Sequence, residues 1–270
     1  MTFLRLSSLA DKRLEVFCGL TNHQLRNSLE PRQGIVIVES EIAIRVALAQ
    51  GVEPVSFLLS EGKAQTMQDV LDNIEQDVPA FVLPEEVAEE LTGYRVTRGA
   101  LCAKRRPVLP SVPALLEKAS NVVVLEGITD TSNVGAIFRN AAALGADGVI
   151  VAPTCADPLS RRAVRVSMGN VFKVSWTRAQ APWPEETMDV LAGLGFECLA
   201  LALTKDAVGI RDVAGGTRKR RALFFGSEGQ GLCKRTLNAC TRSVIIPMHR
   251  GVDSLNVAAS SAVAMWELFG

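Results

Sequence analysis

The stretch Asn121–Val151, NVVVLEGITDTSNVGAIFRNAAALGADGVIV, decides the fold class of this chain. It opens with an apolar run, Val122–Leu125, whose length and β-branched residues predict a buried strand. The polar loop Gly127–Ser132 follows, rich in residues that turn a chain or cap a helix. A helical pattern then ends at Gly145, and Gly148–Ala152 predicts the next buried strand. This order predicts an α/β fold with a parallel sheet, in which ligands bind at the carboxyl ends of the strands.

The start of the predicted helix carries Asn133, Gly135 and Arg139 in an NxGxxxR pattern. Gly135 and Arg139 are four residues apart and share a helix face, so the Arg139 side chain leans over the gap that Gly135 leaves. This arrangement favours a guanidinium held at a helix start beside a ligand. A glycine that caps the helix and a solvated arginine would explain the same spacing.

Length and composition restrict the class of protein. The 270 residues allow one large or two modest domains with a substantial core. The 29 basic and 29 acidic side chains cancel, so any contact with nucleic acid requires local basic patches. The six cysteines form no CxxC pair and only two histidines accompany them, which predicts reduced thiols and no metal site. Without a signal-peptide pattern or an apolar run of membrane-spanning length, we expect a cytoplasmic protein that does not contact a membrane.

The first hundred residues predict a small α/β domain, because strand and helix patterns alternate. We expect strands at Gly34–Val38, Val55–Leu59 and Ala80–Leu83, and helices at Glu41–Gln50, Ala64–Ile74 and Pro84–Leu91.

A proline-rich hinge over 107–112 predicts the boundary between a first domain, 1–106, and a second, 112–270. The basic triplet Lys104, Arg105 and Arg106 precedes the hinge, and it is either a solvated linker or a patch that binds RNA.

The second domain continues with strand and helix patterns after the opening unit. We expect strands near Val171–Trp176 and at Glu197–Ala202, Ala222–Phe225 and Ser243–Pro247. We expect one helix at Glu185–Leu194 and a final helix that ends at Phe269. Before them, Arg161, Arg162 and Arg165 give one helix a positive flank, which suits phosphate or is simply a solvated face.

Two further loops follow buried strands. Gly226–Leu232, GSEGQGL, places three glycines and a carboxylate where backbone comes close to a ligand. It is neither a P-loop, since Leu232 and Cys233 replace the Lys and Ser/Thr, nor a GxGxxG dinucleotide fingerprint. Ser254-Leu255-Asn256 precedes the last helix, and Ser254 or Asn256 could be its N-cap. Asp253 could tune selectivity for RNA or cap the same helix.

Taken together, the patterns NxGxxxR, GSEGxGL and IPM…SLNVA closely resemble the SpoU (TrmH-type) branch of the SPOUT superfamily of RNA methyltransferases. The resemblance covers about 112–270. It implies a trefoil-knotted parallel-sheet domain that binds S-adenosylmethionine, acts without a metal and works as a homodimer with the site at the interface. The first domain resembles the ribosomal-protein-like RNA-binding domain of many members. By similarity, the cofactor contacts are Thr204, Gly226, Ile246, Met248, Leu255 and Ala258.

The implied reaction is methyl transfer to a ribose 2′-hydroxyl of RNA, with ribosomal RNA favoured over transfer RNA by family analogy. The resemblance assigns catalysis to Asn133, Arg139, Glu228, Ser254 and Asn256. Arg139 would activate the hydroxyl or, since arginine rarely releases a proton, act as a fixed positive charge held by Glu228 in a bidentate pair. The alternatives are a catalytically silent knotted RNA-binding protein and a nucleotide-dependent oxidoreductase, and the second lacks its GxGxxG pattern.

Overall fold

The computed structural model describes residues 2–5, 11–20, 30–75, 77–93, 99–214 and 220–270. The chain forms two compact units: residues 1–107 with 159–173, and residues 108–158 with 174–270. The first division falls at the start of the predicted hinge. The segment 159–173, expected in the second domain, groups with the first unit instead.

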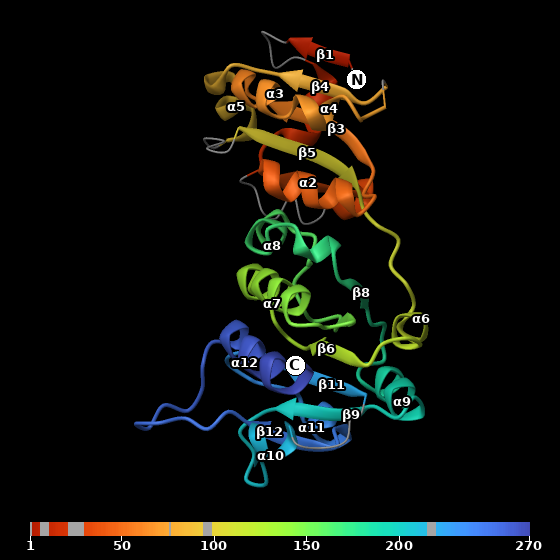
Figure 1. Ribbon diagram of the computed structural model, residues 1–270, viewed down its shortest axis with the longest axis vertical. Helices are drawn as coiled ribbons and strands as arrows, with labels where there is room; N and C mark the ends of the chain where they lie inside the picture. Colours follow the sequence, from red (N-terminus) through yellow and green to blue (C-terminus); the bar gives the residue numbers. More distant parts are fainter. Residues whose placement is uncertain (1, 6–10, 21–29, 76, 94–98, 215–219) are drawn as a thin grey trace. The chain divides into compact units, whose positions relative to one another are not determined.

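The first unit is built on a five-stranded mixed sheet in the order β1-β4-β3-β5-β2 (Figure 1, red to yellow). Its strands are β1 Thr2–Arg5, β2 Ile35–Glu39, β3 Pro54–Leu59, β4 Pro79–Val82 and β5 Ala100–Arg105. Strand β5 runs antiparallel to both its neighbours, β2 and β3, whereas β1, β3 and β4 are parallel. Strand β5 was not predicted from the sequence, because its basic end and the prolines that follow it resemble a linker.

Short helices accompany this sheet. They are η1 Lys12–Phe17, α2 Glu41–Ala49, α3 Glu61–Thr66, α4 Gln68–Leu71, α5 Glu85–Thr92, α8 Arg161–Val166 and η2 Asn170–Phe172. The single helix predicted over Ala64–Ile74 is instead two, because Ser60 caps α3 by accepting from the Lys63 N–H and so starts it earlier, and α3 and α4 meet at the buried Met67. Helix α8 packs against β2 within this unit.

The second unit holds a seven-stranded sheet, β10-β12-β9-β11-β6-β7-β8, in which every pair is parallel. The strands are β6 Asn121–Leu125, β7 Gly148–Val151, β8 Ser175–Arg178, β9 Glu197–Leu201, β10 Val208–Gly209, β11 Arg221–Phe225 and β12 Arg242–Ile245. The parallel-sheet α/β class predicted from the opening stretch is therefore confirmed.

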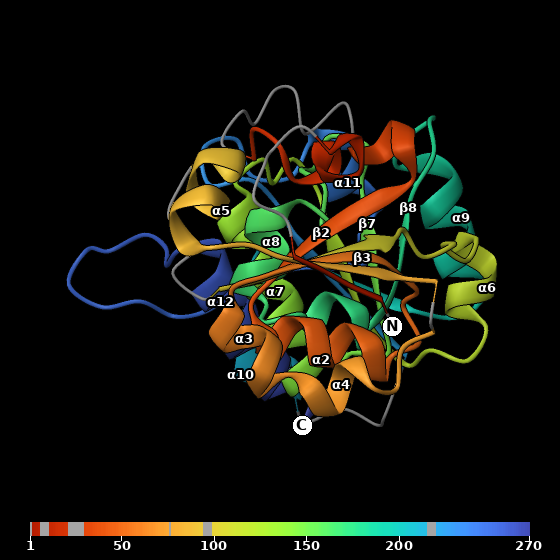
Figure 2. The same cartoon turned by 90° about the horizontal axis from the view of Figure 1, so that it is seen from above.

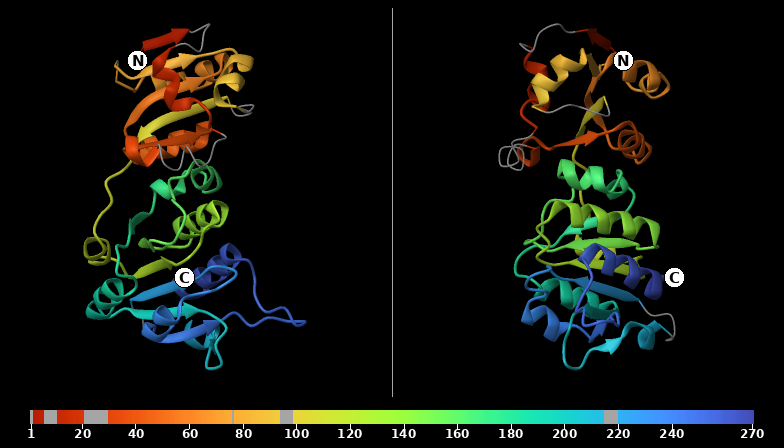
Figure 3. Two further views of the ribbon diagram at one scale, coloured as in Figure 1. Left: turned by 180° about the vertical axis from the view of Figure 1, so that it is seen from behind. Right: turned by 90° about the vertical axis from the view of Figure 1, so that its left-hand side faces the viewer.

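Helices cover both faces of this sheet, so β7 and β11 are buried along their whole length and β6 along all but its first residue. The helices are α6 Val112–Leu116, α7 Thr131–Ala143, α9 Glu185–Gly193, α10 Ile210–Ala214, α11 Lys234–Ala239 and α12 Val257–Phe269. α6, α9 and α11 contribute to the core cluster around Val122, Val124 and Phe224. α7 and α12 pack against each other, as the green and blue helices of Figure 3 show.

The last strands of the chain lie inside the sheet rather than at its edge. Strand β11 inserts between β6 and β9, and β12 inserts between β9 and β10. Helix α12 then returns to pack against α7. The Asn140 side chain secures that return by donating to the Ala258 carbonyl at 2.8 Å and to Ser261 Oγ at 3.0 Å. The loop between β12 and α12 projects from this unit (Figures 1 and 2). This is the segment predicted to be knotted, and the knot itself stays a prediction.

Candidate active site

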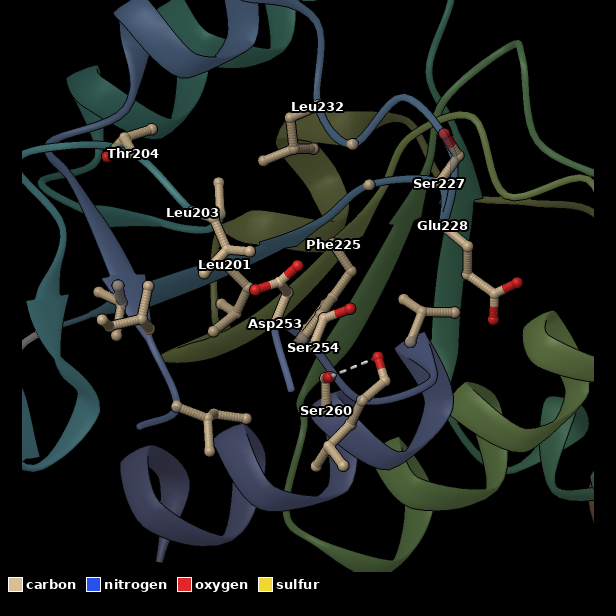
Figure 4. Close-up of a pocket in the computed structure, with 18 of the residues that line it drawn as sticks. Leu201, Leu203, Thr204, Phe225, Ser227, Glu228, Leu232, Asp253, Ser254 and Ser260 are labelled. Carbon is tan, nitrogen blue, oxygen red and sulfur yellow. Dashed lines mark hydrogen bonds between the residues drawn. The ribbon is translucent and has the colours of Figure 1, made fainter. Parts of the chain in front are cut away.

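A pocket of about 390 Å³ opens at the carboxyl ends of β9, β11 and β12 (Figure 4). The chain after each strand supplies part of its wall: Leu201–Thr204, Phe225–Leu232, and, from the third loop, Ile246, Met248 and Asp253–Leu255. Its volume lies within the range of about 300–1,000 Å³ typical of small-molecule sites. Three loops that are distant in sequence therefore form one ligand-sized cavity, as expected where the strands of a parallel sheet end.

The glycine loop after β11 is closed by its own backbone. Ser227 and Gly231 exchange two hydrogen bonds, N–H to O at 3.2 and 2.9 Å, so the chain doubles back over four residues. A Cβ on Gly226 would come within 2.2 Å of the Gly231 carbonyl carbon and 2.4 Å of the Leu232 nitrogen. Only glycine fits there, and the bare backbone of Gly226 borders the pocket.

Glu126, which the sequence analysis did not single out, anchors the far end of this loop. It follows β6 directly and is 6% exposed. Its carboxylate accepts hydrogen bonds from Cys233 N–H at 2.5 Å, from Trp183 Nε1 at 2.7 Å and from the Thr236 hydroxyl. A buried carboxylate is stabilised only when such donors satisfy it. Glu126 therefore fixes the start of α11 next to Leu232, which lines the pocket; a glutamate directly after an apolar strand was the signal that could have indicated it.

A polar cluster of three predicted catalytic residues adjoins the pocket. Asn133 at the start of α7 and Asn256 before α12 both donate through Nδ2 to Glu228 Oε1, at 3.1 and 2.6 Å. Asn256 Nδ2 also lies 3.1 Å from Asn133 Oδ1, which accepts from it. The start of α7 and two loops thus meet at one carboxylate, which the two amides hold in a fixed orientation. Glu228 and Ser254 line the pocket itself.

Arg139 does not join this cluster, which corrects the predicted bidentate pair with Glu228. Its side chain is exposed and makes no hydrogen bond or ion pair with any residue that the structure describes. Helix geometry explains this separation. Residues six apart are rotated by about 240° around the helix axis, so Asn133 and Arg139 lie on different faces of α7. Because Asn133 faces Glu228, Arg139 faces solvent, and Gly135 is buried.

The interpretation of Asn256 as a helix cap is confirmed. Its Oδ1 accepts from the Ala258 N–H at 2.9 Å, which makes it the N-cap of α12. The predicted cap at Asp253 is wrong, because Asp253 lies three residues earlier and lines the pocket instead.

The predicted cofactor contacts divide into two groups. Thr204, Gly226, Ile246, Met248 and Leu255 line the pocket. Ala258 does not line it; its carbonyl accepts from Asn140 and Ser261 on the side of α7. Among the described residues, the buried Thr204 Oγ1 has no hydrogen-bond partner. A buried hydroxyl without a partner is costly, and Thr204 is the residue of the pocket wall that carries this cost.

The predicted RNA-binding triplet Lys104-Arg105-Arg106 is strand and strand end rather than hinge. Lys104 is fully buried and donates from Nζ to the Val52 carbonyl at 2.6 Å. Burial lowers the pKa of its ammonium to about 8. Arg105 is exposed, and Arg106 Nε donates to the Ile35 carbonyl at 2.9 Å. Burial therefore argues against a surface contact for Lys104, whereas RNA binding by the two arginines stays a prediction.

The second predicted RNA-binding set is Arg161, Arg162 and Arg165 on α8, and two of these side chains lie near a buried carboxylate of the same unit. Arg161 NH1 and Arg165 NH1 lie 3.3 and 3.7 Å from the carboxylate of Glu39, whose side chain is 3% exposed. This carboxylate neutralises part of the predicted positive flank. Arg162 is exposed, and RNA binding by this set is likewise untested.

The part of the chain that the structure describes contains no helix long and apolar enough to cross a membrane. Within the same residues, no group of three or more His, Cys, Asp or Glu side chains could hold a metal ion.

A parallel α/β sheet with a pocket at its strand ends is a common ligand-binding arrangement, and comparison with known proteins identifies the family. Residues 120–266 match the SpoU rRNA Methylase family. An uncharacterised tRNA/rRNA methyltransferase of Mycobacterium tuberculosis is 38% identical over 258 residues, or 95% of this chain and 88% of the relative. The chain therefore belongs to the SpoU rRNA methylase family, a branch of RNA methyltransferases.

More distant relatives share most of the chain. The 23S rRNA (adenosine(1067)-2′-O)-methyltransferase of Streptomyces azureus is 27% identical over 86% of this chain and 84% of its own. The crystal structure of an AdoMet-bound rRNA methyltransferase from Sinorhizobium meliloti superposes with a TM-score of 0.83 at 22% identity, covering 98% of this chain and 97% of that one. The similarity to this structure extends over both units of the fold.

Proposed function

We propose that this protein transfers a methyl group from S-adenosylmethionine to a ribose 2′-hydroxyl of RNA, with ribosomal RNA as the favoured substrate and transfer RNA as the second candidate. The observation that carries the proposal is the pocket at three strand ends with the Asn133–Glu228–Asn256 cluster beside it. The activity printed for the Streptomyces azureus relative supports the choice of the 2′-hydroxyl and of ribosomal RNA.

The pocket would hold the cofactor through Thr204, Gly226, Ile246, Met248 and Leu255. When bound, S-adenosylmethionine supplies a methyl group that its sulfonium has already activated for attack by a hydroxyl oxygen. Gly226 offers bare backbone to the ligand.

The cluster would position the target ribose. Glu228 is held by two amide donors through Oε1, which leaves acceptor capacity on the carboxylate for a substrate hydroxyl. Ser254 lines the pocket beside it. Positioning of this kind lowers the barrier because the reacting atoms no longer need to find each other.

Arg139 would act as a fixed positive charge rather than as a base, since a guanidinium retains its proton throughout the physiological range. Its exposed position on α7 leaves it available to an RNA phosphate or to a second copy of the chain. A fixed cation near the site would orient the RNA and stabilise charge that develops on the ribose oxygen.

We further propose a homodimer formed through α12. Val263 and Trp266 lie three residues apart on one face of this helix, and they are 39% and 72% exposed. Large apolar side chains that share an exposed face mark interaction surfaces. Because α7 packs against α12, a dimer formed there would bring the Arg139 region close to the interface.

Methyl transfer from labelled S-adenosylmethionine to total RNA tests the proposal, with wild type and Arg139→Ala in parallel. The RNA comes from cells that lack this protein, so that its target is unmodified. We expect label in one RNA fraction, at a nucleotide that resists alkaline cleavage, and a loss of at least about tenfold in the variant. Cofactor binding without any methylation of RNA or of ribosomal assembly intermediates would instead support a silent RNA-binding protein.

A further inference from the structure

The walls of the pocket carry negative charge only. Two of the lining residues are carboxylates, Glu228 and Asp253, and within the described chain no lysine, arginine or histidine lines it. The rest of the wall is apolar side chains, hydroxyls, an amide and glycine backbone. Such a cavity favours a ligand that brings positive charge.

The two carboxylates differ in what already holds them. Glu228 accepts hydrogen bonds from Asn133 and Asn256. Asp253 is an exposed residue of the pocket rim and has no hydrogen bond or ion pair with any described residue. Figure 4 shows its carboxylate directed into the cavity, close to Leu203 and Ser254, with Glu228 to the right in the same view. Since Asn256 caps α12, Asp253 has no structural role there.

We infer that Asp253 is a specificity-determining residue that lets the pocket prefer the cationic methyl donor to its neutral product. This inference rests on the proposed function, because it concerns the same pocket and cofactor. S-adenosylmethionine and S-adenosylhomocysteine share the adenosine and the amino acid part, and they differ by the methyl group and the positive charge on sulfur. An unpaired carboxylate beside apolar side chains distinguishes them by that charge.

The consequence is favourable release of product. When the methyl group leaves, the carbon–sulfur electron pair stays on sulfur and the cationic sulfonium becomes a neutral thioether. The attraction to Asp253 then disappears, so the product dissociates more readily and competes less with the next donor molecule.

Binding measured by calorimetry tests this charge preference without any turnover. Three ligands serve as probes: S-adenosylmethionine, the neutral S-adenosylhomocysteine, and sinefungin, in which a carbon bearing a charged amine replaces the sulfonium. The full chain is compared with Asp253→Asn, which removes only the charge, and with Asp253→Glu, which keeps it. Asp189→Asn on the exposed face of α9 is the matched control.

We expect Asp253→Asn to weaken both cationic ligands by about three- to tenfold and to change the affinity for S-adenosylhomocysteine by less than about twofold. Asp253→Glu should retain the preference, and Asp189→Asn should bind all three ligands as wild type does. Rising salt should reduce the preference of wild type.

The inference is overturned if Asp253→Asn weakens the three ligands equally or leaves their ratio unchanged. Circular dichroism of the variant checks that an equal loss does not arise from misfolding, and the wild-type ratio across salt concentrations then decides independently. If wild type binds none of the three ligands, the proposed cofactor itself is wrong and the role of Asp253 falls with it. If wild type binds all three without preference for charge, only the role of Asp253 is wrong.

Discussion

Asn256 combines two tasks in one amide side chain. Its Oδ1 caps α12 by accepting from the Ala258 N–H, while its Nδ2 donates to Glu228 and Asn133. The same residue therefore fixes the start of a helix and the orientation of the carboxylate beside the pocket. A side chain with a single hydroxyl can replace the cap but cannot reproduce both hydrogen bonds of the bridge.

This difference separates stability from catalysis. Asn256→Ala should lose the cap and lower the free energy of unfolding by about 1 kcal/mol, which lowers the melting temperature by roughly 2–4 °C. Asn256→Ser should keep a melting temperature close to that of wild type. Both variants should lose methyl transfer by at least about tenfold, because neither holds Glu228. Full activity in Asn256→Ser would show that the bridge is irrelevant to the reaction.

At the scale of elements, the loop after β11 is shaped by the closeness of its own backbone. A Cβ on Gly226 would overlap the backbone of Gly231 and Leu232, whereas a Cβ on Gly229 would meet nothing within 4 Å. The two glycines belong to one loop, so they make a matched pair for mutation.

Gly226→Ala should force the loop open and weaken S-adenosylmethionine binding by tenfold or more, since overlaps of this size require backbone movement. Gly229→Ala should bind within about twofold of wild type. Titration calorimetry measures both. Equal effects of the two substitutions would mean that the close approach at Gly226 does not shape the pocket.

Strand β5 carries a second element-scale feature, the buried Lys104. Burial lowers the pKa of its ammonium from 10.5 to about 8 in the folded chain. Between pH 8 and 10.5 the unfolded chain thus retains a proton that the folded chain has released, and stability rises with pH in that window. Below pH 8 both states are protonated, and the full cost of the buried charge, on the order of 3 kcal/mol, applies.

Lys104→Met should remove this dependence. Between pH 7.5 and 10.5, we expect the unfolding free energy of wild type to rise by about 2–3 kcal/mol relative to that of the variant. Scanning calorimetry at both pH values measures the shift, and the exposed Lys12→Met is the control. A constant difference between wild type and Lys104→Met would show that Lys104 keeps its ordinary pKa.

At the scale of the whole molecule, we expect two copies of the chain to associate through α12. Trp266→Lys places a charge on the exposed apolar face of this helix and should convert a dimer to monomers, because desolvating an unpaired ammonium is costly. Ile42→Lys replaces a residue on α2 that is 55% exposed, and it should leave the dimer intact.

Sedimentation equilibrium measures the oligomeric state of wild type and of both variants. A dimeric Trp266→Lys protein would exclude this face of α12 as the interface, and a monomeric wild type would exclude the homodimer.

The sequence alone determined the fold class and where in the chain the loops that line the pocket lie. Local pattern suffices for both: Val122–Leu125 and Gly148–Ala152 are apolar because strands buried on both faces must be. Gly226 is glycine because backbone passes at contact distance. Resemblance of three short patterns added the family, which the match over 120–266 confirmed.

Only the tertiary structure decided which side chains meet. Glu228 lies 95 residues from Asn133 in sequence, and their contact depends on loop paths and on the rotation of α7, which also turns Arg139 away. The placement of β5 and of α8 depended likewise on distant partners, β2, β3 and Glu39. Periodicity records how a residue relates to its own helix or strand, whereas side-chain pairing depends on how separate elements pack, and no local pattern encodes that packing.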